Sequence, residues 1–223
     1  SKTIGNHFLY LNVGGSMSDK MQRNTDFTAE GFPNDYMEDI IFARQYLLNG
    51  RPVGSENTTR EIGAFTSVSY AYDNRYLVEG TYRANASSQF GKDNRWGQFW
   101  SVGLGWNVHK ERFLQNAKYI DLLKIRGSVG YTGSQGFNSY QSKATFNYNS
   151  AADYLGNFGA FLLGLENTNL QWQRKFDQNI GLDLNMFDRR LTFRFDYYIS
   201  NTDDLLTDVS VPLSTGFTSY KEN

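Results

Sequence analysis

Hydrophobic and polar residues alternate with a period of two along most of the chain, which is typical of β-strands. In residues 75–84, Tyr76 and Tyr82 fall on one side of the alternation, and Glu79 and Arg83 fall on the other. The same period predicts further strands at residues 61–73, 95–108, 123–132, 176–187 and 191–200, and a less regular first strand at 8–15.

The charged residues of these strands lie on one side only. From Glu61 onward, no Lys, Arg, Asp or Glu falls on the apolar side of the six predicted strands. A soluble β-sandwich shows the same one-sided alternation, because its apolar face lines the core. The alternation therefore predicts an antiparallel sheet but does not say what covers its apolar face.

The connections separate these alternatives better. Residues 72–75 and 187–190 form tight turns, residues 109–119 resemble a short helical turn, and residues 86–94, 133–169 and the irregular segment 17–56 are longer. If the first strand runs upward, the long connections fall at one end and the tight turns at the other. Outer-membrane barrels have long extracellular loops and short periplasmic turns, so the pattern favours an antiparallel transmembrane β-barrel segment.

In such a barrel the apolar side faces lipid, where a charge near the membrane centre would cost roughly 2–4 kcal/mol. Strands of about ten residues fit a tilted membrane crossing, and aromatic residues near strand ends fit the interfacial girdles. The aromatic side chains expected to face lipid are Tyr76, Tyr82, Trp96, Trp100, Trp106, Phe193, Phe195 and Tyr197.

The polar side would then face a wet interior. Its charged residues could contact a substrate on its route, or could simply pair across the wall, since opposite charges on neighbouring strands are common. Both interpretations stay open at this stage. The candidate lumen-facing or substrate-contacting residues are Glu79, Arg83, Arg126, Asp183, Arg194 and Asp196.

Composition removes several other functions. The formal net charge of −1 gives no reason to expect a nucleic-acid partner, and cysteine is absent. His7 and His109 have no second ligand at metal-binding spacing, and Asp203–Asp204 lacks the pattern of a calcium loop. No arrangement of catalytic residues is evident. We therefore expect no enzyme activity, no metal and no cofactor.

Several long segments resemble one family. The stretches "YDNRYLVEGTYRANASSQFGKDNRWGQFWSVGLGWNVHKERFL" (72–114), "IDLLKIRGSVGYTGSQ" (120–135) and "NTNLQWQRKFDQNIGLDLNMFDRRLTFRFDYYISNTDDLLTDVSVPLSTGF" (167–217) are similar to the SusC/RagA family of TonB-dependent outer-membrane transporters, in the family's order. The segment "GFPNDYMEDIIFARQY" (31–46) resembles it more loosely. The chain departs from the family pattern at Asn85, Ala86 and Gln89, where two charges and a turn glycine are replaced.

This resemblance implies a barrel of about 22 strands with an internal plug, of which residues 1–223 would supply about seven or eight strands from the later-middle part of one barrel domain. The plug, the TonB box and the last strands would lie outside this chain. It also implies a multi-pass protein of the outer membrane of Bacteroidetes-like bacteria, importing oligosaccharides or peptides. The expected partners are a SusD-like surface lipoprotein that acts as a lid, the TonB complex and membrane lipid.

The long connection at residues 133–169 carries aromatic side chains that would meet a substrate or the lid, or would pack the loop on itself. These residues are Tyr140, Phe146, Tyr148, Tyr154, Phe158 and Phe161. Two other functions remain as alternatives: a small complete outer-membrane barrel acting as an adhesin or anchor, and a soluble carbohydrate-binding β-sandwich. The sandwich predicts that Trp100 and Phe195 are protected from solvent.

Overall fold

The computed structural model describes residues 2–48, 50, 52–114, 117–134 and 139–223, without the side chains of residues 149–154 and 158. Two compact units are present: Ser1–Ser18 together with Arg60–Asn223, and Asp19–Thr59. The larger unit contains most of the main sheet and every residue of the candidate site. No helix in the described part of the chain is long and apolar enough to span a membrane.

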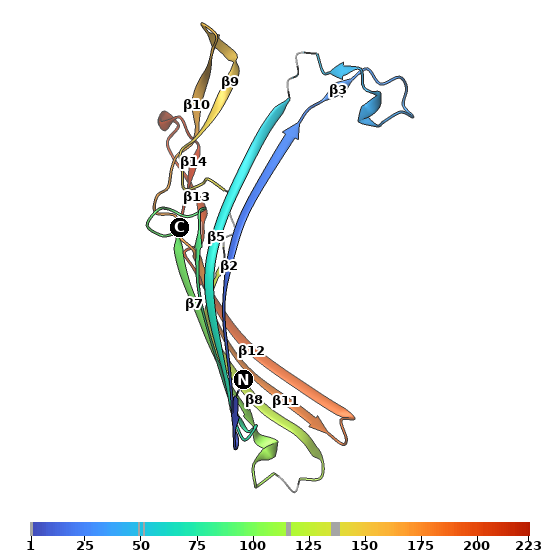
Figure 1. Ribbon diagram of the computed structural model, residues 1–223, viewed down its shortest axis with the longest axis vertical. Helices are drawn as coiled ribbons and strands as arrows, with labels where there is room; N and C mark the ends of the chain where they lie inside the picture. Colours follow the sequence, from blue (N-terminus) through green and yellow to red (C-terminus); the bar gives the residue numbers. More distant parts are fainter. Residues whose placement is uncertain (1, 49, 51, 115–116, 135–138) are drawn as a thin grey trace. The chain divides into compact units, whose positions relative to one another are not determined.

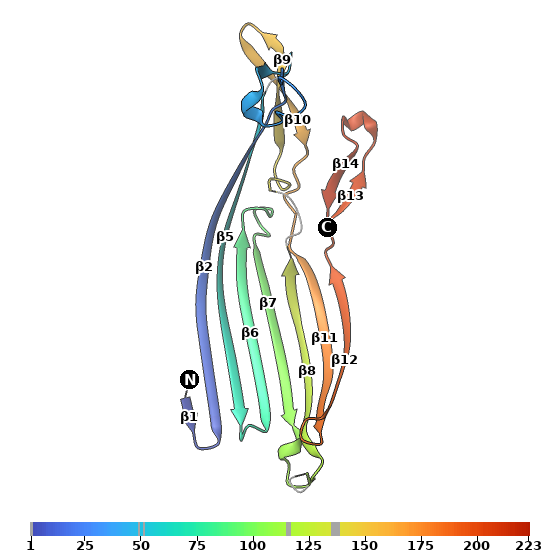
Figure 2. The ribbon, with the colours of Figure 1, turned by 90° about the vertical axis from the view of Figure 1, so that its right-hand side faces the viewer.

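The main sheet has eight antiparallel strands (Figures 1 and 2). Each strand lies next to the main-sheet strand that precedes it along the chain, and the short hairpins inserted between some of these strands belong to separate sheets. In spatial order the strands are β1 (Lys2–Ile4), β2 (His7–Asp26), β5 (Val53–Tyr72), β6 (Tyr76–Ser87), β7 (Trp96–Asn107), β8 (Ile120–Ser134), β11 (Gln173–Met186) and β12 (Leu191–Asp203).

Short elements occupy the long connections. The smaller unit contains β3 (Ala29–Glu30), the 3₁₀ turn η1 (Ile40–Phe42) and β4 (Gln45–Tyr46). In the larger unit, η2 (Val108–Lys110) follows β7, and the hairpin of β9 (Thr145–Tyr154) and β10 (Asn157–Gly164) is inserted between β8 and β11. After β12 come β13 (Thr207–Ser210), η3 (Leu213–Thr215) and β14 (Ser219–Glu222).

The tight turns lie at one end of the strands, and this confirms the predicted asymmetry of the larger unit. Asp73 and Asn74 both have positive φ (52° and 50°), as a two-residue hairpin turn requires. Phe187, Asp188 and Arg189 also have positive φ in the β11–β12 turn. The inserted hairpin β9–β10 extends from the opposite end of β8 and β11 (Figure 2).

Three strand boundaries differ from the expectation. The segment 17–56 was expected to be irregular throughout, but β2 continues to Asp26 and β5 begins at Val53. Likewise, β6 continues to Ser87, with Ala86 opposite Ile62 and Trp96. The added residues of these strands are mostly polar on both sides, so they carry no clear alternation. Backbone hydrogen bonds to the neighbouring strand keep them extended regardless of side-chain pattern.

The register of the ladder puts the predicted apolar residues on one face from β5 to β12. One cross-strand row consists of Tyr76, Trp106, Ile125, Leu182 and Phe195, which are directly opposite one another in turn. Trp96 and Trp106 lie ten positions apart on the same face of β7. That separation is about 33 Å along a strand, or about 25 Å across a membrane at the tilt of barrel strands.

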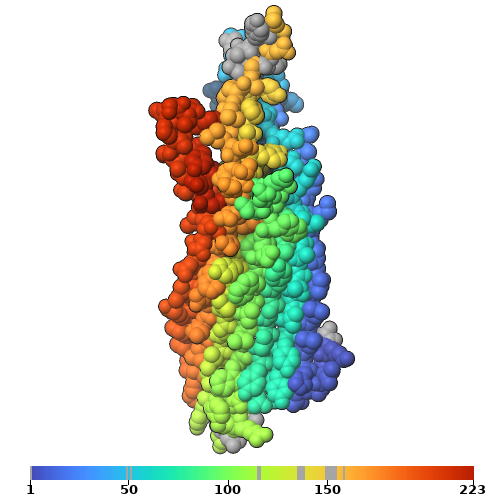
Figure 3. All heavy atoms as spheres, turned by 90° about the vertical axis from the view of Figure 1, so that its left-hand side faces the viewer, coloured from blue at the N-terminus to red at the C-terminus, as the bar shows by residue number. Residues whose placement is uncertain are grey.

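No second layer covers this apolar face. Among the described residues, the buried hydrophobic side chains are only Ala71, Phe90, Phe99, Val108, Leu170 and Trp172. Trp100 is 39% exposed and Phe195 is 51% exposed, which contradicts the prediction made for a soluble sandwich. Figure 3 shows one broad face of the larger unit, where the strands succeed one another side by side across the surface.

The sheet is also open. Strands β1 and β12 are its two edges, and no pairing joins them within the described part of the chain. An open sheet edge is not viable inside a membrane, because its backbone groups have no hydrogen-bond partners there. The eight strands therefore need further strands to complete a wall, and this disfavours the small complete barrel.

The buried aromatic cluster lies at the long-loop end of the wall, where Phe90, Phe99 and Trp172 meet. The Phe90 and Trp172 rings stack at 4.2 Å between centroids, and Phe99 meets Trp172 edge-on at 5.4 Å. Trp172 also donates an Nε1 hydrogen bond of 3.0 Å to the carbonyl of Arg95. The cluster joins the β6–β7 connection to the segment that leads into β11.

Two strand glycines make room for the Phe99 ring. A Cβ on Gly133 would lie 2.0 Å from Cζ of Phe99, and a Cβ on Gly97 would lie 2.5 Å from the same atom. Gly133→Val should therefore lower the free energy of unfolding by roughly 1–3 kcal/mol, the typical cost of overpacking.

The measurement is the urea midpoint of the full-length protein refolded in lipid vesicles. Gly80→Val is the matched control, because no atom lies within 4 Å of a Cβ at Gly80. Equal midpoints for the two variants would show that the packing of the Phe99 ring against these glycines does not stabilise the wall.

Candidate functional site on the polar face of the sheet

Four of the six predicted polar-face residues form one ion-pair cluster across β8, β11 and β12. Nε of Arg126 lies 3.2 Å from Oδ2 of Asp183, and a terminal nitrogen of Arg126 lies 2.5 Å from Oδ1 of Asp196. The other carboxylate oxygen of Asp183 accepts from Nε of Arg194 at 3.0 Å. Two cations and two anions thus alternate, which balances the charge of this part of the wall.

A glycine at the centre of the cluster permits this arrangement. Gly181 lies directly opposite Arg126 on β8 and Asp196 on β12. A Cβ on Gly181 would lie 2.7 Å from Cζ of Arg126 and 2.8 Å from Oδ1 of Asp196. The Arg126–Asp196 pair therefore bridges over the backbone of β11 in space that only glycine leaves open.

Glu79 lies beside this cluster in a shallow hollow on the same face. The hollow has a volume of about 200 Å³ and is floored by Gly103 and Gly105, with Glu79, Lys124 and Arg126 among the residues that line it. Within the described part of the chain, neither Glu79 nor Lys124 has an ion-pair partner. The hollow therefore offers one free carboxylate and one free ammonium group.

Arg83 lies away from the cluster. Its neighbours directly across the ladder are Phe65 on β5 and Phe99 on β7, and its Nε donates to Oδ1 of Asn85 at 2.9 Å. Of the six predicted polar-face residues, four therefore form the ion-pair cluster, Glu79 lies beside it at the hollow, and Arg83 is separate.

The outer-loop candidates are only partly gathered together. Phe146 and Tyr148 lie on β9 with exposed fractions of 65% and 75%, and Phe161 on β10 is also exposed. Tyr140 lies before the hairpin in a turn and has positive φ (68°). The side chains of Tyr154 and Phe158 lie outside the described residues.

The predicted lipid-facing aromatics lie on the opposite face of the wall from the ion-pair cluster. Cross-strand register places them together: Tyr82 is opposite Trp100, Tyr76 is opposite Trp106, and Ala86 is opposite Trp96. Phe193, Phe195 and Tyr197 lie opposite Leu184, Leu182 and Ile180. All eight side chains are exposed in this chain.

Sequence analysis missed a hydrogen-bonded hub at the tight-turn end of the wall. The carboxylate of Glu111 accepts from the Tyr76 hydroxyl at 2.8 Å, from Trp106 Nε1 at 3.0 Å and from Arg75 at 3.1 Å. Its side chain is 13% exposed. The spacing of Trp106 and Glu111 around the short turn η2 was a usable signal, because interfacial aromatics present polar atoms toward such turns.

The hub changes the protonation of Glu111. Hydrogen bonds to the charged form, first from Trp106 and then from Tyr76, lower the pKa of the Glu111 carboxyl, with Arg75 acting in the same direction. The pKa of Arg75 is raised, because Asp73 and Glu111 accept its hydrogen bonds. The hub is therefore charged at neutral pH and ties the β5–β6 turn to the β7–β8 connection.

The described residues contain no group of three or more His, Asp or Glu side chains that could hold a metal ion. The polar face thus combines paired charges, a free carboxylate and a free ammonium group, and hydroxyl-bearing residues such as Ser200, which donates to Oδ1 of Asp177 at 2.7 Å. Such a surface is suited to contact with polar solutes.

Comparison with known families decides the assignment. Residues 4–222 match the family described as "TonB dependent receptor-like, beta-barrel". The chain belongs to this family. It is therefore part of an outer-membrane β-barrel of this receptor family, which is not a family of enzymes.

Curated relatives include the TonB-dependent receptor SusC of Bacteroides thetaiotaomicron, which is 36% identical over 97% of this chain. The TonB-dependent receptors P39 and P3 of Formosa agariphila are 34% and 32% identical over 89% and 100% of it. The chain covers 21%, 19% and 22% of these proteins, respectively, or about a fifth of their length.

Solved structures share the fold. The RagAB peptide transporter superposes with a TM-score of 0.84 at 24% identity, over 98% of this chain and 24% of that chain. The RagAB peptide importer in the "open-open" state gives a TM-score of 0.82 over 99% of this chain. The sheet from β1 to β12 is therefore a section of such a barrel wall, and the SusC/RagA resemblance is confirmed.

A methyl group at position 181 would test the ion-pair cluster. Gly181→Ala should lower the free energy of unfolding by up to about 1 kcal/mol, the usual contribution of a part-exposed ion pair, because its Cβ displaces the ends of the Arg126 and Asp196 side chains. Urea midpoints of the full-length receptor in lipid vesicles measure the effect.

Gly103→Ala, on the same face, is the matched control, since its Cβ would meet no atom closer than 3.9 Å. In an Arg126→Met background, which removes the displaced group, Gly181→Ala should cost much less. An unchanged cost there would place the strain in the backbone instead of the ion pair.

The hub predicts acid sensitivity at the tight-turn end. Because the folded pKa of Glu111 is lowered, its contribution to stability is present above the ordinary carboxyl pKa and is lost as the pH falls through the lowered pKa. Glu111→Gln, which keeps one acceptor oxygen, should flatten this part of the pH profile.

The measurement is the urea midpoint against pH for the full-length wild type and variant. Other carboxylates contribute the same background to both proteins, so the difference between the two curves isolates Glu111. Parallel curves across the acidic range would contradict the assignment.

Proposed function

We propose that this chain is a section of the wall of an active nutrient importer of the outer membrane. The observation that carries the proposal is the family match over residues 4–222, on a sheet with an uncovered apolar face and a charged opposite face. The apolar face contacts lipid, and the polar face lines the lumen. Plug, TonB box and remaining strands belong to other parts of the full-length protein.

The substrates we propose are oligosaccharides or peptides. The structural neighbours described as a peptide transporter support peptides, and the resemblance to the SusC/RagA family implies oligosaccharides as well. The exposed aromatic side chains of Phe146, Tyr148 and Phe161 on the β9–β10 hairpin provide apolar faces that can stack on sugar rings or contact peptide side chains.

The proposed partners are a SusD-like surface lipoprotein, which covers the long-loop end, and the TonB complex, which supplies energy through the plug. A group of exposed apolar residues marks an interaction surface more often than a single exposed apolar residue does. On the polar face, Glu79, Arg83, Arg126, Asp183, Arg194 and Asp196 line the substrate route or meet the plug.

The test uses the full-length protein in its native membrane. An antibody to residues 133–169 should detect a polypeptide several times heavier than 25.5 kDa in the outer-membrane fraction, with a surface lipoprotein co-purifying. Uptake of labelled oligosaccharide or peptide mixtures should stop when a protonophore collapses the proton-motive force. Uptake that persists would contradict active import, and a membrane band near 25.5 kDa would support the small barrel instead.

A further inference from the structure

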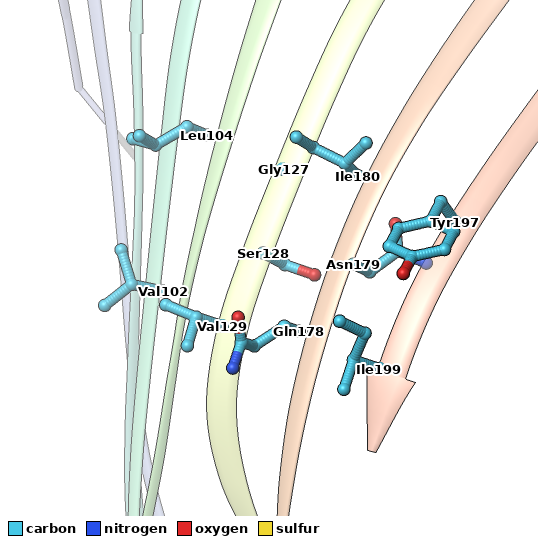
Figure 4. Close-up of a pocket in the computed structure, with 10 residues that line it drawn as sticks. All are labelled: Val102, Leu104, Gly127, Ser128, Val129, Gln178, Asn179, Ile180, Tyr197 and Ile199. Atoms are coloured by element: carbon cyan, nitrogen blue, oxygen red, sulfur yellow. The ribbon is translucent and has the colours of Figure 1, made fainter.

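The apolar face carries a groove that the family assignment does not explain. It has a volume of about 370 Å³, within the usual range for ligand pockets, and spans β7, β8, β11 and β12. Gly127 lies in its floor, and the apolar walls come from Val102, Leu104, Val129, Ile180, Tyr197 and Ile199 (Figure 4).

The missing side chain of Gly127 creates the groove. Gly127 lies in a cross-strand row between Leu104 and Ile180, and Tyr197 is the next residue in that row. A Cβ on Gly127 would meet no atom closer than 3.8 Å, so no neighbour fills the space. An apolar recess of this kind loses dispersion contacts unless hydrocarbon occupies it.

Three polar residues line the groove, but Ser128 and Asn179 occupy polar-face positions of the ladder, so only Gln178 brings a polar side chain to the apolar face there. Gln178 occupies an apolar-face position on β11, directly between Val129 and Ile199 (Figure 4). Its amide makes no hydrogen bond to any residue that the structure describes. An unpaired amide facing hydrocarbon is costly, so a hydrogen-bond partner must come from what fills the groove.

The depth of Gln178 indicates the kind of partner. On β11 the apolar face extends from Phe176 to Met186, and beyond Phe176 the next residue on that face is Arg174, which pairs with Asp204 at 3.0 Å. Gln178 is the first position inward of Phe176, about 7 Å along the strand. The amide therefore lies just inside the long-loop boundary of the apolar band, where ester and hydroxyl oxygens join lipid chains to their headgroups.

We propose that this groove binds one acyl chain of an outer-leaflet lipid, with the Gln178 amide hydrogen-bonded to an ester or hydroxyl oxygen near the head of that chain. The chain lies over Gly127, between the walls from β7 and β12. The absence of a charged side chain among the lining residues fits hydrocarbon. This inference rests on the lipid-facing orientation of the apolar face given under Proposed function.

The experiment is native mass spectrometry of the full-length receptor, extracted from its outer membrane in mild detergent. The wild type should retain a bound lipid. Gly127→Leu fills the groove and should lower the retained fraction by about tenfold, the loss expected when about two methylene groups lose their burial. Gln178→Leu should also lower retention.

Gly80→Leu is the matched control, because Gly80 lies in the same cross-strand row as Val102, Val129 and Gln178 but does not line the groove. It should retain lipid as the wild type does. Equal lipid retention by Gly127→Leu and the wild type would overturn the proposal. It would also be overturned if Gly127→Leu released a bound protein and not a lipid. If Gly127→Leu prevents insertion of the receptor into the membrane, Ile199→Trp replaces it in the experiment, because the larger side chain blocks the groove from its rim.

A second measurement separates failure of the groove from failure of the orientation. Brominated lipids should quench less of the fluorescence in Trp100→Phe than in wild type, while Trp172→Phe, which removes a buried tryptophan, should leave the quenched fraction unreduced. If Trp100 is not quenched, the lipid-facing orientation itself is wrong. If it is quenched and Gly127→Leu retains lipid normally, only the groove proposal is wrong.

Discussion

The register of the antiparallel ladder from β5 to β12 is the constraint on which the other features depend. Side chains alternate between the two faces at every residue, so a slip of one position exchanges the faces. Such a slip in β8, β11 or β12 would turn Arg126, Asp183 or Asp196, respectively, toward the lipid. For a cationic side chain near the membrane centre the cost is roughly 2–4 kcal/mol. Because the two faces differ so completely, only one register is compatible with a membrane.

Strand glycines have two different roles in the wall. Gly181 leaves space for an ion pair to cross over β11, and Gly97 leaves space for the ring of Phe99, so the protein's own side chains fill both positions. Gly80 and Gly127 on the apolar face and Gly103 on the polar face have no atom close to where a Cβ would lie. The space at Gly103 forms part of the hollow beside Glu79, whereas the space at Gly80 and Gly127 is open to the surroundings of the apolar face.

Much of the wall was predictable from the sequence, because a membrane-spanning strand reports its two environments in alternate residues. The six strands from Glu61 onward, their faces and their tight turns follow from that alternation. The extended ends of β2 and β5 do not, since residues such as Asp19, Lys20 and Glu56 are polar on both sides and only backbone pairing keeps them extended. The β9–β10 hairpin was missed for a related reason: a two-stranded element with no core need not have one apolar face.

The candidate site was predictable as a set of residues but not as an arrangement. Alternation assigned Arg126, Asp183, Arg194 and Asp196 to one face, yet their grouping depends on which strands are neighbours and on a register that single-strand patterns do not contain. Arg83 has the same pattern and pairs with none of them. The Glu111 hub needed both the register of β6 with β7 and the path of the following turn.

Gln178 shows where a break in a pattern is informative. The apolar series of β11 runs through Phe176, Ile180, Leu182, Leu184 and Met186, and position 178 is the one polar residue within it. A polar residue in a lipid-facing series weakens the strand signal, so sequence analysis passes over it. In the structure the same residue adjoins the recess above Gly127. An unsatisfied amide and an unfilled apolar space lie side by side, and a lipid chain that carries an oxygen near its head would satisfy both.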